Sequence, residues 1–313
     1  MTGLNEPCPN GGNMFGFRPD GKVVNGQIDP IIKLVPFIMR RRNDSQVFYK
    51  IFVNSAPLDK YIGEVRRNGT TLSAMTILIA AYVRTLAELP VMNRFVVNKQ
   101  IYDRNEIAIA FTILKSNTKE NSEETTVKLF FKPGETLSQI NKKITDAINE
   151  NKPITNKSSI DKLVRGLLSL PFLTNAGVLT CMFLDRYGLL PKTVINLSPF
   201  HSSLFVSNMA SIGMDAIYHH IYNFGTTSAF MGIGKKQRRL KISARGEAVT
   251  ESCYPVGIVI DERIATGAQY ALFFNIMKRY LKNPELLELA PDEKCEINRD
   301  AGVEMPEELA VTQ

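Results

Sequence analysis

The sequence predicts an α/β domain built around a mixed β-sheet. Strand-like and helix-like segments are interspersed without the regular strand–helix–strand rhythm of a doubly wound fold. The chain has 313 residues, which suffices to bury a large core without a disulfide or a metal. Hydrophobic residues make up 44% and charged residues 22%, values that exclude long disorder, collagen and coiled-coil classes. Length alone would also allow two domains.

Residue periodicity predicts the elements of the first half. Val47–Val53 is rich in β-branched and aromatic residues, which is typical of a strand. Thr71–Leu89 has apolar residues at three- and four-residue steps and ends before Pro90, which predicts a helix. The polar residues 116–124 are expected to form a hairpin loop. By the same criteria we expect helices over 57–67 and 136–150, and strands over 95–97, 107–114 and 127–131.

The second half begins with an apolar stretch, 160–190, that is predicted to be helical. It contains Arg165, Pro171 and Asn175, which a membrane-spanning helix rarely holds together. We therefore interpret it as a buried or interface helical pair and expect no membrane contact. Strands are then predicted over 204–206, 228–233 and 256–260, followed by a helix over 267–281.

Cysteine usage and the N-terminus bear on compartment and metal content. The four cysteines form no CxxC pair and no cluster with histidine, so we predict no metal site. Scattered single cysteines are typical of a reducing cytoplasm, and Cys181 and Cys253 are expected to be inert. Residues 1–16 lack the basic start and apolar core of a signal peptide. The predicted localisation is cytoplasmic.

Several separate segments occur in an order that resembles a known family. In the second half these are Phe205–Met209, Ile212–Asp215, Ala229–Gly234 and Gly257–Ala268, and in the first half Val35–Arg42 and Leu89–Phe95. Together they resemble the catalytic domain of the dihydrolipoyl acyltransferases of 2-oxoacid dehydrogenase complexes, which are related to chloramphenicol acetyltransferase. The resemblance covers about residues 28–283.

This resemblance divides the chain into three parts. We expect an irregular arm over 1–27, an acyltransferase-like domain over 28–283 with a helical insertion around 160–190, and an acidic tail over 284–313. The arm is too short to hold a lipoyl domain, so no lipoyl attachment is expected on this chain. The net charge is +7, but 284–313 holds nine acidic and two basic residues.

The resemblance implies a chloramphenicol acetyltransferase-like two-layer sandwich with a mixed β-sheet. It also implies a homotrimer with active sites between subunits and a coenzyme A (CoA) thioester as substrate. The family's chemistry uses an H-x-x-x-D-G motif, in which the His is the general base and the Asp pairs with an Arg. A Ser on a preceding strand stabilises the tetrahedral oxyanion. A neutral imidazole suits the first role, and a fixed hydroxyl donor suits the last.

The motif is altered in this chain. Ser207 carries over as the oxyanion donor, but the His position holds Glu262 and the Asp position holds Thr266. Only the glycine, Gly267, is retained. A carboxylate becomes a useful base for a thiol when burial raises its pKa, which makes Glu262 a candidate base. The alternative is that Glu262 pairs with an arginine, either Arg263 or one of residues 40–42.

Two of the three histidines, His219 and His220, form a second candidate base. They stand in a run that nearly spells the family motif, but this run precedes the 228–233 strand. A contact pair in a loop or at a trimer interface is the alternative interpretation. Thr266 cannot replace the aspartate of an Asp–Arg ion pair.

A basic run follows Gly234 and includes Lys235, Lys236 and Arg238. It is a candidate binding site for the phosphates of CoA, and a solvated hairpin is the alternative. No aromatic residues interleave these charges, so nucleic-acid binding is not expected.

Three functions stay open on the sequence. The first is a CoA-dependent acyltransferase that acts on a small thiol, hydroxyl or amine acceptor. The second is an inactive homologue that serves as a structural or assembly subunit with a related active subunit. The third is a protein that binds a CoA ligand without turnover.

Overall fold

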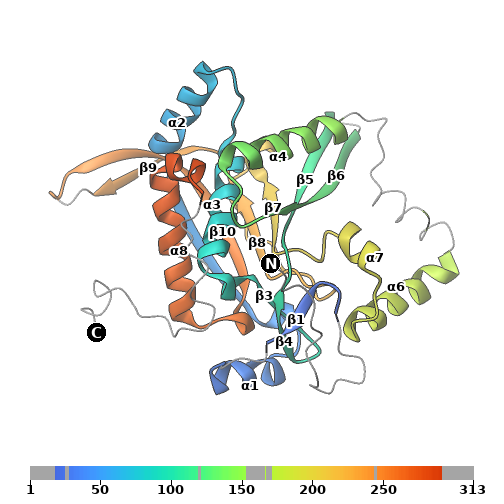
Figure 1. Cartoon of the computed structure of the whole chain (residues 1–313). Helices are drawn as coiled ribbons and strands as arrows, with labels where there is room; N and C mark the ends of the chain where they lie inside the picture. Colours follow the sequence, from blue (N-terminus) through green and yellow to red (C-terminus); the bar gives the residue numbers. More distant parts are fainter. Residues whose placement is uncertain are drawn as a thin grey trace, which may run out of the picture.

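The structure, a computed structural model, describes residues 18–24, 28–118, 121–152, 166, 171–242 and 245–290. Its centre is a seven-stranded sheet (Figure 1). The strand order is β2-β10-β8-β7-β5-β6, and β9 pairs with the outer part of β10. The strands are β2 (Gln46–Asn54), β5 (Ile107–Thr118), β6 (Asn121–Phe131), β7 (Leu204–Asn208), β8 (Ala229–Ile233), β9 (Gln237–Ile242) and β10 (Ala248–Asp261).

The sheet is mixed, as the sequence predicts. β7 runs parallel to both β5 and β8, whereas the other neighbouring strands of the sheet are antiparallel. In register, Ser207 of β7 lies opposite Gly232 of β8, which lies opposite Gly257 of β10. This line across three strands fixes where the candidate site residues stand relative to one another.

Helices cover one face of the sheet and form the core with it (Figure 1). The central helix is α3 (Ala74–Glu88), which is buried along most of its length because the helices α4 (Leu137–Asn151) and α8 (Gly267–Lys282) flank it and its side chains join those of the strands in the core. Helix α2 (Ser55–Arg67) packs beside them against β10. The helices and strands that the sequence predicts in these regions are confirmed, with ends that differ by a few residues.

A smaller sheet joins the N-terminal segment to the domain. Its strands are β1 (Gly21–Val23), β4 (Gln100–Arg104) and β3 (Arg94–Val97), in the order β1-β4-β3. Arg18, just before β1, is buried and forms ion pairs with Asp20 and Asp185. Within the stretch expected to be an irregular arm, residues 18–23 are therefore held by a strand and by buried charges.

The other face of the sheet is partly covered by an irregular segment, residues 209–228, which we call the cover segment. Ile221 of this segment packs against Phe230 and Val259 of the sheet. Its backbone approaches the strands closely at Gly232 and Gly257, since a Cβ at either position would lie 2.6 or 2.5 Å from the carbonyl oxygen of Ile217. Glycine at these two positions is thus what lets the segment lie on the sheet.

The structure differs from the sequence-based prediction in one loop and in several strands. The expected hairpin loop 116–124 is largely strand, because Ser116, Asn117 and Thr118 pair with residues of β6. The strands β1, β4 and β9 and the first part of β10 were not predicted, because their exposed polar residues mask the alternation of a half-buried strand.

The apolar stretch contains helix α6 (Pro171–Arg186), and α7 (Lys192–Leu197) follows it. Most of 160–170 lies outside the described residues. Figure 1 shows α6 projecting beside the sheet. Among the helices of the described chain, none combines the length and apolarity needed to cross a bilayer.

Candidate functional site

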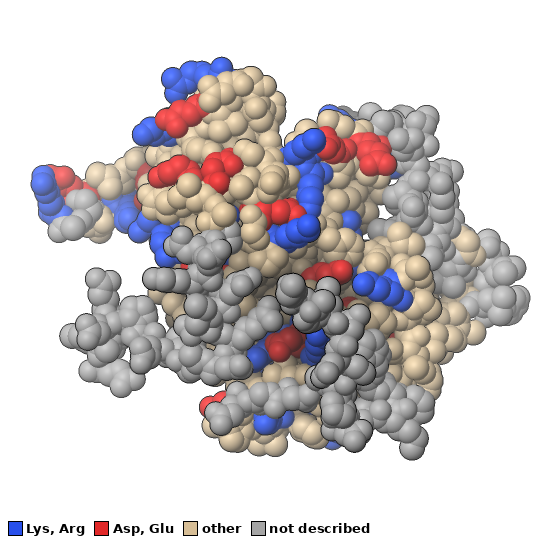
Figure 2. Space-filling model, viewed as in Figure 1, with Lys and Arg blue, Asp and Glu red and all other residues tan. Residues whose placement is uncertain are grey.

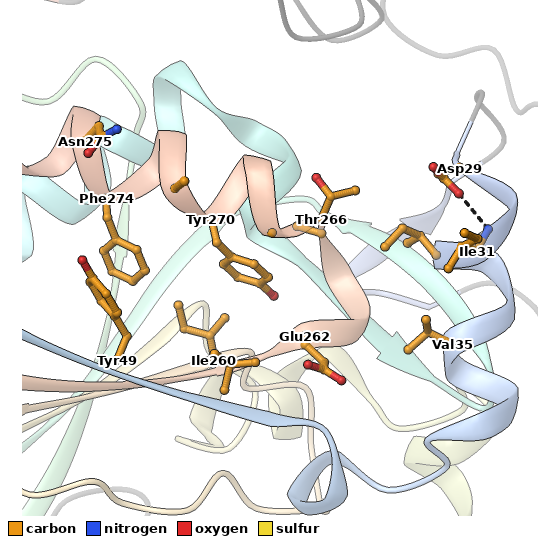
Figure 3. A pocket seen from close by; sticks show the side chains of 15 residues that line it. Asp29, Ile31, Val35, Tyr49, Ile260, Glu262, Thr266, Tyr270, Phe274 and Asn275 are labelled. Carbon is orange, nitrogen blue, oxygen red and sulfur yellow. Dashed lines mark hydrogen bonds between the residues drawn. The ribbon is translucent and has the colours of Figure 1, made fainter. Parts of the chain in front are cut away.

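A pocket of about 690 Å³ lies where β2 and β10 meet the start of α8 and the N-terminal helix α1 (Pro30–Ile38) (Figure 3). Its size is within the usual range for small-molecule sites. Apolar side chains dominate its lining, among them Val35 of α1, Val47 of β2 and Ile260 of β10. Glu262 and Thr266, the two altered positions of the family motif, both line it.

Glu262 follows directly after β10, at the first position of a short 3₁₀ turn, Glu262–Ile264. Its backbone N–H donates to the carbonyl oxygen of Ser45 at 2.9 Å, which ties the turn to the start of β2. The side chain is half-buried, and Figure 3 shows its carboxylate between Ile260 and Val35. It has no ion pair or side-chain hydrogen bond with any residue that the structure describes.

The arginines expected as possible partners of Glu262 bind its neighbour. Arg263 pairs with the carboxylate of Asp261 at 2.6 Å, and Arg42 lies 3.5 Å from the same carboxylate. Ser45 donates its hydroxyl to Asp261 at 3.0 Å. Burial lowers the pKa of Arg42 to about 10, against the opposing effect of Asp261. These contacts satisfy the buried Asp261 and leave the charge of Glu262 uncompensated by arginine.

Thr266 is the N-cap of α8. Its hydroxyl accepts the N–H of Gln269, and the Gln269 side chain accepts the N–H of Thr266, which completes a capping box. This cap satisfies two backbone donors at the start of the helix. Thr266 therefore has a local structural role in this chain and takes no part in an ion pair.

Ser207 stands on the opposite face of the sheet, on the side of the cover segment. Phe205, two residues earlier on the same strand, packs against the cluster of Ile221, Phe230 and Val259. The Ser207 hydroxyl is half-buried and lies 3.1 Å from the sulfur of Met209. Ser207 is two strands away from Gly257 of β10, its counterpart in register, and Glu262 lies five residues beyond Gly257 along the chain. From strand spacing and rise, the Cα atoms of Ser207 and Glu262 are therefore roughly 15–20 Å apart. A single chain does not bring them together.

His219 lies on the same face as Ser207. Its ring stacks on Phe230 with centroids 4.3 Å apart. Because a carbonyl oxygen only accepts, the Nδ1 of His219 donates to the carbonyl of His220 at 2.8 Å. This leaves Nε2 with the lone pair, and it has no hydrogen-bond partner among the described residues. His220 is exposed and contacts the edge of Tyr222.

The basic run lies at the protruding β9–β10 hairpin. Lys236 pairs with Asp59 at 2.5 Å, and Lys235 and Arg238 are exposed or nearly so. Arg239 covers the ring of Phe52, and Lys241 lies 3.7 Å from Glu251. On the face shown in Figure 2, basic and acidic side chains are interspersed, without a continuous basic surface.

A buried charge network was missed from the sequence. His201, 1% exposed, lies between Asp185, 3.1 Å from its Nε2, and Ser198, 2.8 Å from its Nδ1. Burial lowers the pKa of His201 and outweighs the opposite effect of Asp185. Although burial opposes its charged form, the pKa of Asp185 is held below its usual value by His201 and Arg18. No sequence signal joins these residues, because Arg18 is 167 positions from Asp185.

Neither of the two described cysteines lines the pocket. Cys253 is buried, with its pKa raised mainly by burial, and Cys181 on α6 is half-buried. In the described ranges, no group of three or more His, Cys, Asp and Glu residues is arranged to hold a metal ion.

Comparison with known proteins supports the resemblance. Residues 200–289 match the family model of the 2-oxoacid dehydrogenases acyltransferase (catalytic domain). No curated protein matches this sequence. The sequence thus resembles this family, and the matched residues include both Ser207 and Glu262.

The fold is that of the same group of proteins. A structure of a probable dihydrolipoamide acetyltransferase from Listeria monocytogenes 4b F2365 aligns with a TM-score of 0.52 and 15% identity, over 82% of this chain and 93% of that one. The cubic core of a pyruvate dehydrogenase multienzyme complex gives 0.52 and 15%, over 85% and 96%. A chloramphenicol acetyltransferase gives 0.53 and 12%, over 84% and 100%. The predicted mixed-sheet, chloramphenicol acetyltransferase-like α/β fold is confirmed.

Proposed function

We propose that this protein transfers an acyl group between a CoA thioester and a small acceptor, with Glu262 as the general base. The observation that carries the proposal is the free carboxylate of Glu262. It occupies the motif position of the family's base, it lines a pocket of ligand size, and the nearby arginines are bound to Asp261. A base must be free to receive a proton, and an ion-paired Glu262 would have argued against this role.

In the proposed reaction the acceptor's nucleophilic atom attacks the thioester carbonyl carbon while the Glu262 carboxylate removes its proton. The tetrahedral intermediate then collapses, the C–S bond breaks, and the CoA thiolate leaves and takes the proton. Ser207 is the proposed donor to the oxyanion. A fixed hydroxyl aimed at this charge stabilises the transition state more than the bound substrate.

The separation of Ser207 and Glu262 supports an active site shared between copies of the chain. Two residues roughly 15–20 Å apart, and on opposite faces of one sheet, cannot contact the same carbonyl group. We infer a homotrimer in which Glu262 of one subunit meets Ser207 of the next. The large exposed apolar side chains Phe48, Phe52 and Tyr218 provide surface that such an interface would bury.

We assign the phosphates of CoA to Lys235, Lys236 and Arg238. These cations are exposed at the start of the β9 hairpin, and phosphate oxygens favour such groups. Lys236 would exchange its ion pair with Asp59 for the ligand. We place the protein in the cytoplasm, in agreement with Cys181 and Cys253, the cysteines that the structure describes, which are both unpaired.

The test is release of free CoA thiol from acetyl-CoA with a panel of small thiol, hydroxyl and amine acceptors. Glu262→Gln keeps the shape of the side chain but removes the base, and we expect it to lower kcat/KM about 10²-fold or more. Ser207→Ala should also lower it by about 10²-fold, as for loss of one oxyanion donor. Asp146→Asn on α4 removes an exposed carboxylate outside the pocket and serves as the matched control.

A second candidate function is that of an inactive homologue that binds CoA or assembles with a related active subunit. The observation that favours it is Thr266, because this residue caps α8 where the family has an aspartate that pairs with an arginine. Binding of CoA without thiol release for any acceptor, together with no effect of Glu262→Gln, would select this function and refute the first.

A further inference from the structure

The charges that face the pocket are all negative. Of the residues that line it, Glu262 and Asp29 are the ionisable acids, and none is a lysine, arginine or histidine. Asp29 accepts the N–H of Ile31 as the cap of α1, with one oxygen at 2.8 Å. Figure 3 shows Asp29 at the α1 side of the pocket and Glu262 near its middle.

Three other polar side chains of the lining, those of Thr266, Tyr270 and Tyr49, are already hydrogen-bonded, whereas the amide of Asn275 lies at the exposed end of the pocket. Tyr270 donates its hydroxyl to the carbonyl of Asp261 at 2.6 Å, and the Thr266 hydroxyl accepts the N–H of Gln269. Lys278 reaches the pocket's edge at the Tyr49 hydroxyl, at 3.2 Å. In Figure 3 Tyr49 lies beside Phe274, on the side of Glu262 that is away from Asp29. The ammonium of Lys278 is thus bound at the Tyr49 hydroxyl and forms no ion pair with either carboxylate among the described residues.

The rest of the lining is apolar. Ile31, Val35 and Val47 come from α1 and β2, and Ile260 and Phe274 from the sheet and α8. Covering such a surface with an apolar ligand lowers the free energy of the complex. A carboxylate without a partner loses hydration when the ligand closes over it, which raises the free energy. A ligand with an apolar body and a cationic head satisfies both. An anionic ligand would place like charges together beside apolar side chains.

Building on the proposed function, we propose that the acyl acceptor is an apolar primary amine, whose ammonium form binds at Glu262 and Asp29. The ammonium first releases one proton to solvent. The neutral nitrogen then attacks the thioester carbon, a C–N bond forms and the C–S bond breaks. Glu262 passes the second nitrogen proton to the departing CoA thiolate, so the products are an amide, CoA thiol and one proton.

Two measurements test this proposal with hexylamine as the probe and hexan-1-ol and hexane-1-thiol as matched neutral probes. The first is binding to the full chain, followed by NMR or calorimetry, without acetyl-CoA. We expect hexylamine to bind at least tenfold more tightly than hexan-1-ol, and Glu262→Gln to remove that difference. Asp29→Asn should reduce it by a smaller factor, and Asp146→Asn should leave it unchanged.

The second measurement is CoA thiol release with the same three acceptors. Faster acylation of hexylamine than of the alcohol and the thiol supports the proposal. Acylation of the thiol or the alcohol with none of the amine overturns the acceptor class and leaves the proposed function intact. Hexylamine binding that depends on Glu262, with no acylation of any acceptor, retains the cation site and refutes the proposed function. Equal binding of hexylamine and hexan-1-ol refutes the cation site itself.

Discussion

Gly257 offers a sharp test of how the cover segment lies on the sheet. In Gly257→Ala the new Cβ would stand 2.5 Å from the carbonyl oxygen of Ile217 and 3.1 Å from its carbonyl carbon. An ordinary carbon–oxygen contact is about 3.3–3.6 Å, so segment and strand must separate by about 0.8–1.1 Å. The two Ile217 atoms belong to the backbone, and the backbone of residue 257 fixes the position of the new Cβ. No change of rotamer can therefore relieve the clash.

The expected cost follows from that forced displacement. An extra methyl in a well-packed site destabilises by about 1–3 kcal/mol. Gly257→Ala should therefore lower the free energy of unfolding by that amount and move the cover segment, with His219, away from Phe230. Gly63→Ala in α2 is the matched control, because nothing lies within 4 Å of the new methyl. An alanine inside a helix should instead stabilise by about 0.5–1 kcal/mol.

Urea unfolding followed by circular dichroism measures both variants, and the chemical shifts of the His219 ring report the position of the segment. A Gly257→Ala variant with unchanged stability and unchanged His219 shifts would refute the close contact. Gly232→Ala adds a second check on the same atom, since its Cβ would lie 2.6 Å from the Ile217 oxygen.

Three further predictions concern stability. Asp185→Asn leaves the buried Arg18 with one carboxylate partner fewer, and we expect a loss of about 3–5 kcal/mol in urea unfolding, against little change for exposed Asp146→Asn. Because the pKa of His201 is lower in the folded state, its contribution to the free energy of unfolding should be complete above about pH 6.5 and should decline as the pH falls below that value. The pKa of Asp185 is also lowered by folding, and its contribution should be lost as the pH falls below about 3.9. A His201→Gln variant that retains the first decline would contradict the assignment to His201. Thr266→Ala removes the α8 cap and should cost about 1 kcal/mol, whereas Thr266→Ser should cost much less.

Much of the core could be predicted from the sequence because buried elements carry strong periodicity. Helix α3 and the inner part of β10 are apolar at the spacing of their structure, and both were expected. The β9 hairpin was not, because its residues are exposed on both faces and give no alternation between apolar and polar positions.

The site was only partly predictable, since its residues are brought together by register and tertiary packing. The sequence alone identified Ser207 and Glu262 as candidates, but their separation depends on the alignment of β7, β8 and β10. The partner of Arg263 could not be predicted from the sequence either. Either of two neighbouring carboxylates, Asp261 or Glu262, could have bound it, and only the direction of the side chains decides.

The altered motif loses less geometry than its sequence suggests. The motif that the sequence resembles would place an aspartate, paired with an arginine, at the position of Thr266. Here the turn that carries Glu262 is held on one side by Asp261, which binds Arg263, Arg42 and Ser45, and on the other by the Thr266 cap. The side chain of Asp261 and the capping box of Thr266 thus hold the turn on its two sides, without an aspartate at position 266. The turn that carries Glu262 is therefore positioned by Asp261 and Thr266, although Thr266 stands where the family motif has an aspartate.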